Sequence, residues 1–390
     1  MPTLPDGTRN GPFAGVLIAD LTHALSGPFC TMLLAELGAR VVKIERAPAG
    51  DISRAFGPLV DGQSAYFDNI NRGKESIALD IEAHPDRELF RELVRRADVV
   101  AENFRPGTLE RHGLGYESLR QINPRLILTS ISGFGTTGPD SWEGAYDTVI
   151  QGMCGLISVT GFPDGPPTMV GEAIADCLTG TMAFGAIGAA LFDRERTGRG
   201  AHIDIAMFDC MLTIMQCALA IYLATGTTPG RIGNNYPVAA PFGVFRTGAG
   251  YLTLCAANDL AFGRLCTALA VPALATDPRF AGPLARAANS DALRAVLEAA
   301  LAEHTAAEWV DKLQHSGVPC GVINTIAQAV EDPQTAARNM ILRAGAARVP
   351  GNPLKMNTLA DPPERRPAPA IDGDGPAIRS ELATSAERNG

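Results

Sequence analysis

The 390-residue sequence lacks every arrangement of cysteine and histidine that would indicate a metal site. Its eight cysteines are scattered, with no CxxC pair and no Cys/His zinc spacing. The same scatter gives no disulfide framework, so we expect reduced, mostly buried thiols in a cytoplasmic protein that needs no metal. Residues 1–15 contain no basic segment followed by an apolar stretch, and we therefore expect no signal peptide.

Positive charge is also scarce. The sequence has 33 Lys and Arg against 42 Asp and Glu, a formal net charge of −9, which argues against nucleic acid or an anionic membrane as the main partner. Residues 173–192 and 210–226 approach the composition of membrane spans. The first is rich in Gly and Ala and carries a carboxylate. We therefore expect helices buried in a large core or at an oligomer interface, not in a membrane.

Three common catalytic and nucleotide-binding signatures are missing as well. There is no P-loop and no Ser-His-Asp set in a GxSxG frame. The first strand–turn–helix reads DLTHALSGPF, with Gly27 as its single glycine, where a dinucleotide fingerprint would have GxGxxG. Glu45 ends the second expected strand at a place suited to a ribose-binding acid. Without the glycines, however, an NAD-dependent dehydrogenase is disfavoured.

What the sequence does contain is an alternation of short apolar strands and helices over its first 135 residues. This order is typical of an α/β fold with a Rossmann-like, mainly parallel, doubly wound sheet. The expected strands cover residues 15–21, 40–45, 76–81, 98–102 and 125–132, and the expected helices cover 28–37 and 85–96. Further along, Ile203, Ile205 and Met207 mark another strand by their alternation.

The length of the sequence predicts two domains, because single cores rarely grow beyond roughly 250–300 residues. Residues 227–243 are marked by Pro and Gly and are typical of an inter-domain linker. We predict a large domain over residues 1–226 and a smaller α+β domain over residues 244–325. The C-terminal segment, residues 326–390, is expected to return to the large domain.

Asp176 is the only charged residue between positions 173 and 192. A carboxylate among apolar side chains is costly to ionise. One interpretation is that Asp176, followed by Thr179, caps the helix that runs to Phe192. The other is that the acid is kept for its altered reactivity, as a carboxylate nucleophile.

Cationic side chains gather before residue 112, and two of their segments lie at sheet–loop junctions. These are NRGK at residues 71–74 and ENFRPG at residues 102–107, where several cations could converge on phosphates. Most single basic residues are simply solvated. Phe104 either stacks on an adenine or packs within its loop, and His23 in the first turn either contacts a ligand or makes local hydrogen bonds only.

The order and spacing of many segments between residues 14 and 357 resemble the family III CoA-transferases. The matching text includes DLTHALSGPF, LAELGARVVKIERAPAGD, FDNINRGKESIALD, ADVVAENFRPG, VGEAIADCLTG and RTGRGAHIDIAMFD. The resemblance implies a Rossmann-like large domain, a smaller domain and a homodimer of two chains threaded as interlocked rings. It also implies that acyl-CoA and a carboxylic acid are the substrates, that no metal takes part, and that Asp176 is the nucleophile.

The resemblance further implies which residues hold coenzyme A. These positions are His23, Ala24, Arg46, Leu79, Asn103, Phe104, Arg105 and Arg111. The cationic pattern adds Arg72 and Lys74 as candidates for phosphate contact.

Two departures from related enzymes narrow the expected activity. Acyl-CoA racemases of the same superfamily have a histidine at the position of Tyr146, so an epimerase, the alternative function, lacks one half of its proton-transfer pair. Formyl-CoA:oxalate transferases have a glutamine at the position of Leu25 and a tetraglycine loop, both absent here, which disfavours oxalate or formate. With His23, these two residues are expected to line the substrate pocket, and Arg54 or Arg72 to pair with a second carboxylate. A non-enzymatic CoA-ester sensor is the third possibility.

Overall fold

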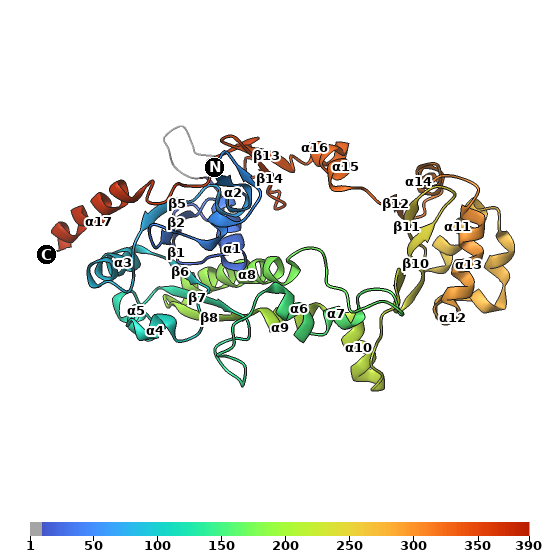
Figure 1. Ribbon diagram of the computed structural model, residues 1–390, viewed down its shortest axis with the longest axis horizontal. Coiled ribbons are helices and arrows are strands. Elements are labelled where there is room, and N and C mark those ends of the chain that lie inside the picture. Colours follow the sequence, from blue (N-terminus) through green and yellow to red (C-terminus); the bar gives the residue numbers. More distant parts are fainter. Residues whose placement is uncertain (1–9, 390) are drawn as a thin grey trace. The chain divides into compact units, whose positions relative to one another are not determined.

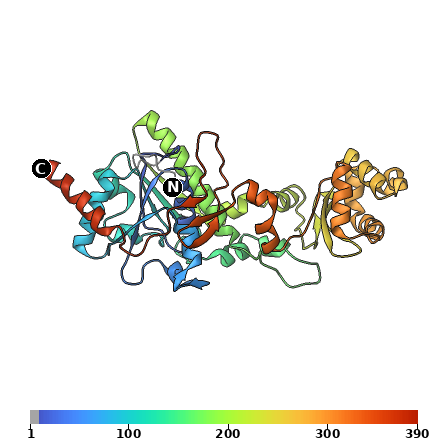
Figure 2. The same ribbon diagram turned by 90° about the horizontal axis from the view of Figure 1, so that it is seen from above.

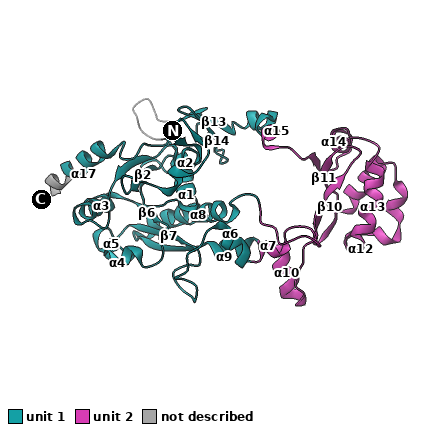
Figure 3. Cartoon of the chain, viewed as in Figure 1, with its two compact units in different colours: residues 1–154, 171–214, 330–390 teal, residues 155–170, 215–329 magenta. Residues whose placement is uncertain are grey.

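The structure, a computed structural model, describes residues 10–389, and the chain divides into two compact units. Unit 1 comprises the described residues up to Cys154, the stretch Gly171–Ile214, and the residues from Val330 onward. Unit 2 comprises Gly155–Val170 and Met215–Ala329 (Figure 3). Each unit has its own hydrophobic core.

Unit 1 is built on a six-stranded sheet in which every neighbouring pair is parallel. Its strands are β1 (Leu17–Asp20), β2 (Arg40–Glu45), β5 (Glu75–Ala78), β6 (Val99–Glu102), β7 (Ile127–Ser132) and β8 (Ala201–Ala206). They lie in the order β5-β2-β1-β6-β7-β8. From β1 the chain adds β2 and β5 on one side and then β6, β7 and β8 on the other, so the strand order reverses between β1 and β6. Doubly wound sheets bind ligands at this switch point. The mixed α/β fold with its parallel sheet confirms the prediction from the strand–helix alternation.

Both faces of this sheet are buried, as the apolar strand runs predict. Neighbouring residues of β1 enter different cores, with Ala19 in one and Ile18 in the other. The first core is covered by α3 (His84–Arg96), α5 (Tyr116–Ile122) and α17 (Gly375–Asn389); the second by α1 (Ser26–Glu36) and α8 (Ile174–Thr197) (Figures 1 and 2).

Smaller elements complete unit 1. The helices are η1 (Ile52–Ala55), α2 (Ala65–Asn71), α4 (Thr108–Arg111), α6 (Asp147–Met153), α9 (Met207–Ile214) and α16 (Pro333–Ala337). The strands are β3 (Leu59–Val60), β4 (Gln63–Ser64), β13 (Ile341–Ala344), β14 (Ala347–Pro350) and β15 (Glu364–Arg365). The C-terminal segment packs on this unit, because Ile378 and Leu382 enter its core and Arg379 donates to the carbonyl of Ala78 at 3.0 Å.

Unit 2 holds a four-stranded antiparallel sheet covered by helices. Its strands are β9 (Asn235–Tyr236), β10 (Ala239–Arg246), β11 (Tyr251–Cys255) and β12 (Cys320–Val322). Its helices are α7 (Leu156–Val159), α10 (Gln216–Thr225), α11 (Asp259–Ala268), η2 (Pro272–Thr276), η3 (Pro278–Phe280), α12 (Pro283–Ala288), α13 (Ser290–Leu301) and α14 (Ala306–His315), with α15 (Ile326–Glu331) at the boundary. Leu252 and Leu254 alternate inward and pack in one core with Trp309.

The unit boundaries differ from the predicted ones in two stretches, because Gly155–Val170, with α7, and the residues of α10 belong to unit 2. The apolar run over residues 210–226 is broken at Met215 into α9 and α10, which are bent by 75°. As a result α10 belongs to unit 2, although the sequence placed residues up to 226 in the large domain. By length and composition α8 could cross a membrane, and α9 with α10 pass the same test as a bent pair. Ala183 and Ile187 of α8 are nevertheless fully buried in the sheet core.

A glycine sets the distance between α8 and α1. A Cβ atom at Gly180 would lie 2.5 Å from the carbonyl oxygen of Ser26 and 3.1 Å from the ring of Phe29. Only hydrogen fits there, so α8 comes close to the first turn of α1. On the same helix Gly185 has open space around its Cα, and a methyl group added there would meet nothing within 4 Å.

We expect Gly180→Ala to lower the free energy of unfolding by about 1–3 kcal/mol, because the new methyl forces the two helices apart. Gly185→Ala is the matched control, and should be neutral or stabilise by up to about 1 kcal/mol, since alanine is the better helix former. Urea unfolding of both variants checks this. Equal midpoints for the two would contradict the close approach.

Candidate active site

Asp176 lies in the first turn of α8 and does not cap it. The helix begins at Ile174, and its N-cap residue, Ala173, makes no side-chain cap bond. The cap comes from α6, where Asp147 Oδ1 accepts the backbone N–H of Ala175 at 2.7 Å and that of Asp176 at 3.3 Å. The capping interpretation of Asp176 is therefore wrong, because Asp147 takes that role.

The Asp176 carboxylate meets the first turn of α1. Ser26 hydrogen-bonds it through both its hydroxyl and its backbone N–H, and both bonds favour the ionised form. Burial, helped by the nearby charge of Asp147, outweighs them and raises the pKa of Asp176 to about 6. Near neutral pH the group is therefore a carboxylate held at an energetic cost, which is the condition of a reactive nucleophile.

Two neighbouring groups are kept neutral. Burial first, and then the charge of Asp176, raise the pKa of the Cys177 thiol to about 11. The same two causes raise the pKa of Tyr66, which comes from α2. Because the thiol stays protonated near neutral pH, the ionised group at this place is the Asp176 carboxylate and not the cysteine.

The loops after β1 and β6 are tied together where the sheet order reverses. The backbone N–H of His23 donates to Asn103 Oδ1 at 2.9 Å, and Asn103 Nδ2 donates back to the carbonyl of His23 at 2.8 Å. The His23 ring lies 5.6 Å from the ring of Phe104, and burial lowers the pKa of His23. Ala24 adopts a left-handed conformation (φ 64°), and its N–H bonds Asp51 at 3.0 Å.

Two of the predicted phosphate contacts are structural instead. Lys74 has no exposed surface, and its ammonium bonds Asp20 at 3.0 Å and Asn71 at 2.8 Å. Arg72 is 3% exposed and pairs with Glu36 at 2.8 Å. A buried cation leaves such a partner only at a cost of several kcal/mol. We therefore remove both residues from the predicted CoA-contacting set.

The same reason applies to the expected partner of a second substrate carboxylate. Arg54 donates to both oxygens of Glu45, each at 2.7 Å, and its guanidinium lies over the ring of Phe67, so it is already engaged within the fold. With Arg72 also paired, neither candidate named from the sequence is available for that role.

The remaining predicted residues divide by exposure. Arg46, Arg105 and Arg111 present their side chains to solvent, and Arg46 pairs loosely with Asp80 at 3.1 Å. Leu79 is 3% exposed and lies in the sheet core, which leaves only its backbone for a ligand. The two predicted pocket residues adjoin the neighbours of Asp176. Leu25 directly precedes Ser26 and is buried, whereas Tyr146 directly precedes Asp147 and is 70% exposed.

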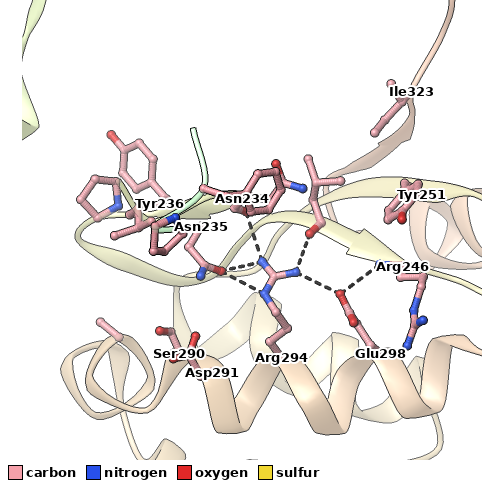
Figure 4. A pocket seen from close by; sticks show the side chains of 16 residues that line it. Asn234, Asn235, Tyr236, Arg246, Tyr251, Ser290, Asp291, Arg294, Glu298 and Ile323 are labelled. Carbon is pink, nitrogen blue, oxygen red and sulfur yellow. Dashed lines mark hydrogen bonds and ion pairs between the residues drawn. The ribbon is translucent and has the colours of Figure 1, made fainter. Parts of the chain in front are cut away.

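A pocket of about 840 Å³ lies within unit 2 (Figure 4). Arg294 lines this pocket, but its guanidinium already donates hydrogen bonds to Asn235, to the carbonyl of Val244 and to Glu298. None of the predicted site residues lines this pocket. Asp176, whose pKa is raised to about 6, remains the candidate catalytic residue, because pocket size alone does not identify chemistry.

Similarity to known proteins identifies the family of this chain. Residues 13–375 match the family described as CoA-transferase family III. This chain belongs to that family. It is 51% identical to an acetyl-CoA:oxalate CoA-transferase of Acetobacter aceti over 374 residues, covering 96% of each chain. It is 38% identical to a succinate–glutarate CoA-transferase of Agrobacterium fabrum, covering 96% of this chain and 97% of that one.

Two similar solved structures support the fold of this family III member. A CAIB/BAIF family protein from Brucella suis is 42% identical with a TM-score of 0.84, and the match covers 96% of this chain and 100% of that one. The protein Rv3272 from Mycobacterium tuberculosis is 30% identical with a TM-score of 0.85, covering 95% and 99%.

Sequence reasoning missed three side chains around Asp176. Asp147 precedes it by 29 positions and belongs to a different helix, so no local pattern connects the two. Ser26 stands within the recognised DLTHALSGPF segment but had no assigned role, and Tyr66 had no signal at all. The aspartate beside Tyr146 was the available hint, since it adjoins a position already compared with the racemases.

The pKa of Asp176 predicts a pH-dependent cost to stability. An acid with a raised folded pKa destabilises the fold only where it is ionised, so the cost is absent below about pH 3.8 and complete above about pH 6. We expect Asp176→Asn to unfold with a free energy about 1–3 kcal/mol higher than wild type at neutral pH, and with no such gain at about pH 4. Thermal unfolding at both pH values checks this. The exposed Asp193 of the same helix, changed to Asn, should show no pH-dependent gap.

Proposed function

We propose that this protein moves CoA from an acyl-CoA donor to a small carboxylic acid, with Asp176 as the nucleophile. The observation that carries the proposal is the position of the Asp176 carboxylate, which is hydrogen-bonded by Ser26 and whose pKa is raised to about 6 by burial. The names of the relatives, which include transferases of acetyl-CoA and succinyl-CoA, support the reaction class.

The reaction follows from this carboxylate. One oxygen of Asp176 attacks the donor thioester carbonyl. The C–S bond breaks, CoA leaves as a thiolate, and a mixed anhydride of Asp176 and the donor acid is formed. The thiolate attacks the aspartyl carbonyl, releases the donor acid as a carboxylate, and leaves an aspartyl-CoA thioester. The acceptor carboxylate then attacks the carbonyl of this thioester, which releases the CoA thiolate and forms a second mixed anhydride, of Asp176 and the acceptor. The thiolate attacks the acyl carbonyl of the second anhydride, which yields the new acyl-CoA and free Asp176.

The surroundings of Asp176 fit these steps. The half-buried position of Asp176 limits the access of water, which would hydrolyse an anhydride. The backbone N–H of Ser26 is a fixed donor for charge that develops on the aspartyl carbonyl oxygen in each tetrahedral intermediate. Asp147 pins the first turn of α8, so the carboxylate is oriented before substrate arrives.

We place CoA along the carboxyl edge of the sheet, between the loops that follow β1 and β6. His23, Ala24, Asn103 and Phe104 form the joined loops there, and this is the general ligand position of a doubly wound sheet. The exposed cations that remain for the phosphates are Arg46, Arg105 and Arg111.

For the acceptor we propose a short dicarboxylic acid. Relatives of this chain carry names with oxalate, glutarate, mesaconate and citramalate. Leu25, in place of a glutamine, argued against oxalate, but a relative at 51% identity is named for oxalate. Oxalate therefore belongs in the acceptor panel alongside longer dicarboxylates.

The central test compares Asp176→Ala with the exposed Asp193→Ala of the same helix. We expect the first to lose acyl exchange by at least about 1,000-fold while CoA still binds, and the second to keep wild-type rates. Mass spectrometry follows thioester exchange from acetyl-CoA and succinyl-CoA to oxalate and longer dicarboxylates. Exchange near the wild-type rate in Asp176→Ala would sink the mechanism, and solvent deuterium entering the acyl α-carbon without an acceptor would favour the epimerase.

We also propose that two copies form the interlocked homodimer implied by the family. The apolar window of α8 is only 33% buried within one chain, and Phe192 of that helix is 70% exposed. Light scattering after gel filtration should give about twice the 41.0 kDa of one chain at micromolar concentration. A mass of one chain under these conditions would contradict the proposal.

A further inference from the structure

A line of hydrogen bonds runs beneath the turn at residues 103–105. Glu102, at the end of β6, is 7% exposed, and its Oε2 accepts the backbone N–H of Phe104 at 2.8 Å. Glu102 also hydrogen-bonds Ser130 on β7, whose hydroxyl lies 3.0 Å from Nε2 of His202 on β8. His202 is exposed to solvent, and its ring stacks on that of Tyr116 with the two centroids 5.4 Å apart. The buried Glu102 is therefore connected through Ser130 to the solvent-exposed His202.

Glu102 has no basic partner in the described part of the chain. The charges that raise its pKa are those of Glu110 of α4 and Asp204 of β8, both acidic. Arg105 lines the same small cavity but, among the described residues, forms no ion pair with Glu102, and the titratable His202 lies beyond Ser130. Burial, together with these two charges, raises the pKa of Glu102 to about 7 against the opposing bonds from Ser130 and Phe104. The reaction proposed for Asp176 makes no use of this acid.

The hydrogen-bond line has a consistent direction in each protonation state of Glu102. When the acid is neutral, its O–H donates to Ser130 Oγ, and the serine hydroxyl donates to Nε2 of a neutral His202. When Glu102 is ionised, the serine hydroxyl donates to the carboxylate and His202 Nε2–H donates to the serine oxygen. Both states keep every partner bonded, so the proton can be exchanged without breaking the turn.

We propose that Glu102 is a positioning residue whose protonation is coupled to CoA binding at the turn of residues 103–105. The inference rests on the proposed function, because it takes this turn as part of the CoA site. CoA brings a diphosphate close to three acids, Glu102, Glu110 and Asp204, beside the exposed cation Arg105 of the same turn. A neutral Glu102 meets that anion without repulsion while it still holds the Phe104 N–H, so binding favours proton uptake, and proton loss weakens binding.

The experiment measures affinity for dephospho-CoA by calorimetry from about pH 6 to about pH 8.5. This probe keeps the diphosphate but has no 3′-phosphate, whose own titration would fall in the same range. Glu102→Gln keeps an acceptor for the Phe104 N–H and a donor for Ser130 without the charge. We expect wild-type affinity to fall about 3- to 10-fold more across the range than that of Glu102→Gln. Asp176 and His23 are present in both proteins, so their contributions to the pH dependence of affinity cancel when the two proteins are compared.

Two further measurements make the result specific. Ser130→Ala removes a bond that favours the carboxylate, so the midpoint of the affinity change should move to higher pH. Glu110→Gln, a matched change at an exposed acid, should keep the pH dependence of the wild type with a midpoint at slightly lower pH. Wild-type titrations near neutral pH in buffers of different ionisation enthalpy should show net proton uptake, which needs no variant to fold.

The outcomes separate this inference from the proposed function. Superimposable pH profiles for wild type and Glu102→Gln, or no proton uptake by the wild type, would overturn the coupling and leave CoA transfer intact. Absence of dephospho-CoA binding by the wild type at every pH would overturn the CoA site and the coupling together.

Discussion

Helix α8 approaches the first turn of α1 so closely that a side chain at Gly180 would strike the backbone of Ser26. This contact brings the Asp176 carboxylate within reach of two hydrogen bonds from Ser26. Asp147 fixes the same turn of α8 from the opposite direction, through the N–H groups of Ala175 and Asp176. The proposed nucleophile is therefore oriented by backbone packing and capping, and a looser contact between α1 and α8 would leave this half-buried acid without the bonds from Ser26.

Buried charges in unit 1 fall into two kinds, and the presence of a partner separates them. Lys74 with Asp20, and Arg72 with Glu36, are cation–anion pairs whose removal on either side would strand a charge in the core. The half-buried Asp176 and the buried Glu102 have no basic partner among the described residues, and burial raises the pKa of both toward neutrality. The paired charges join segments far apart in the sequence, whereas the unpaired acids, with pKa values near neutrality, are able to change state under physiological conditions.

The reversal of strand order between β1 and β6 connects these features. The loops that follow the two strands meet there and are joined by the reciprocal bonds of His23 and Asn103. Glu102 ends β6 directly below this junction, and the loop after β1 leads within a few residues to Ser26. A ligand on the junction would thus contact the loop that carries the partner of Asp176 and the turn that covers Glu102.

Local pattern alone was sufficient for the strand–helix alternation, the parallel sheet and the isolation of Asp176, because side-chain hydropathy repeats with the period of each element. The recognised segments then identified the family. Which cations face a ligand was decided only by the tertiary structure: Lys74 and Arg46 look alike in sequence, yet one is sealed against Asp20 and the other is open to solvent. The capping of α8 by Asp147 likewise joins residues from different helices. Pairing of charges across a fold depends on distances between segments far apart in the chain, and no local periodicity records them.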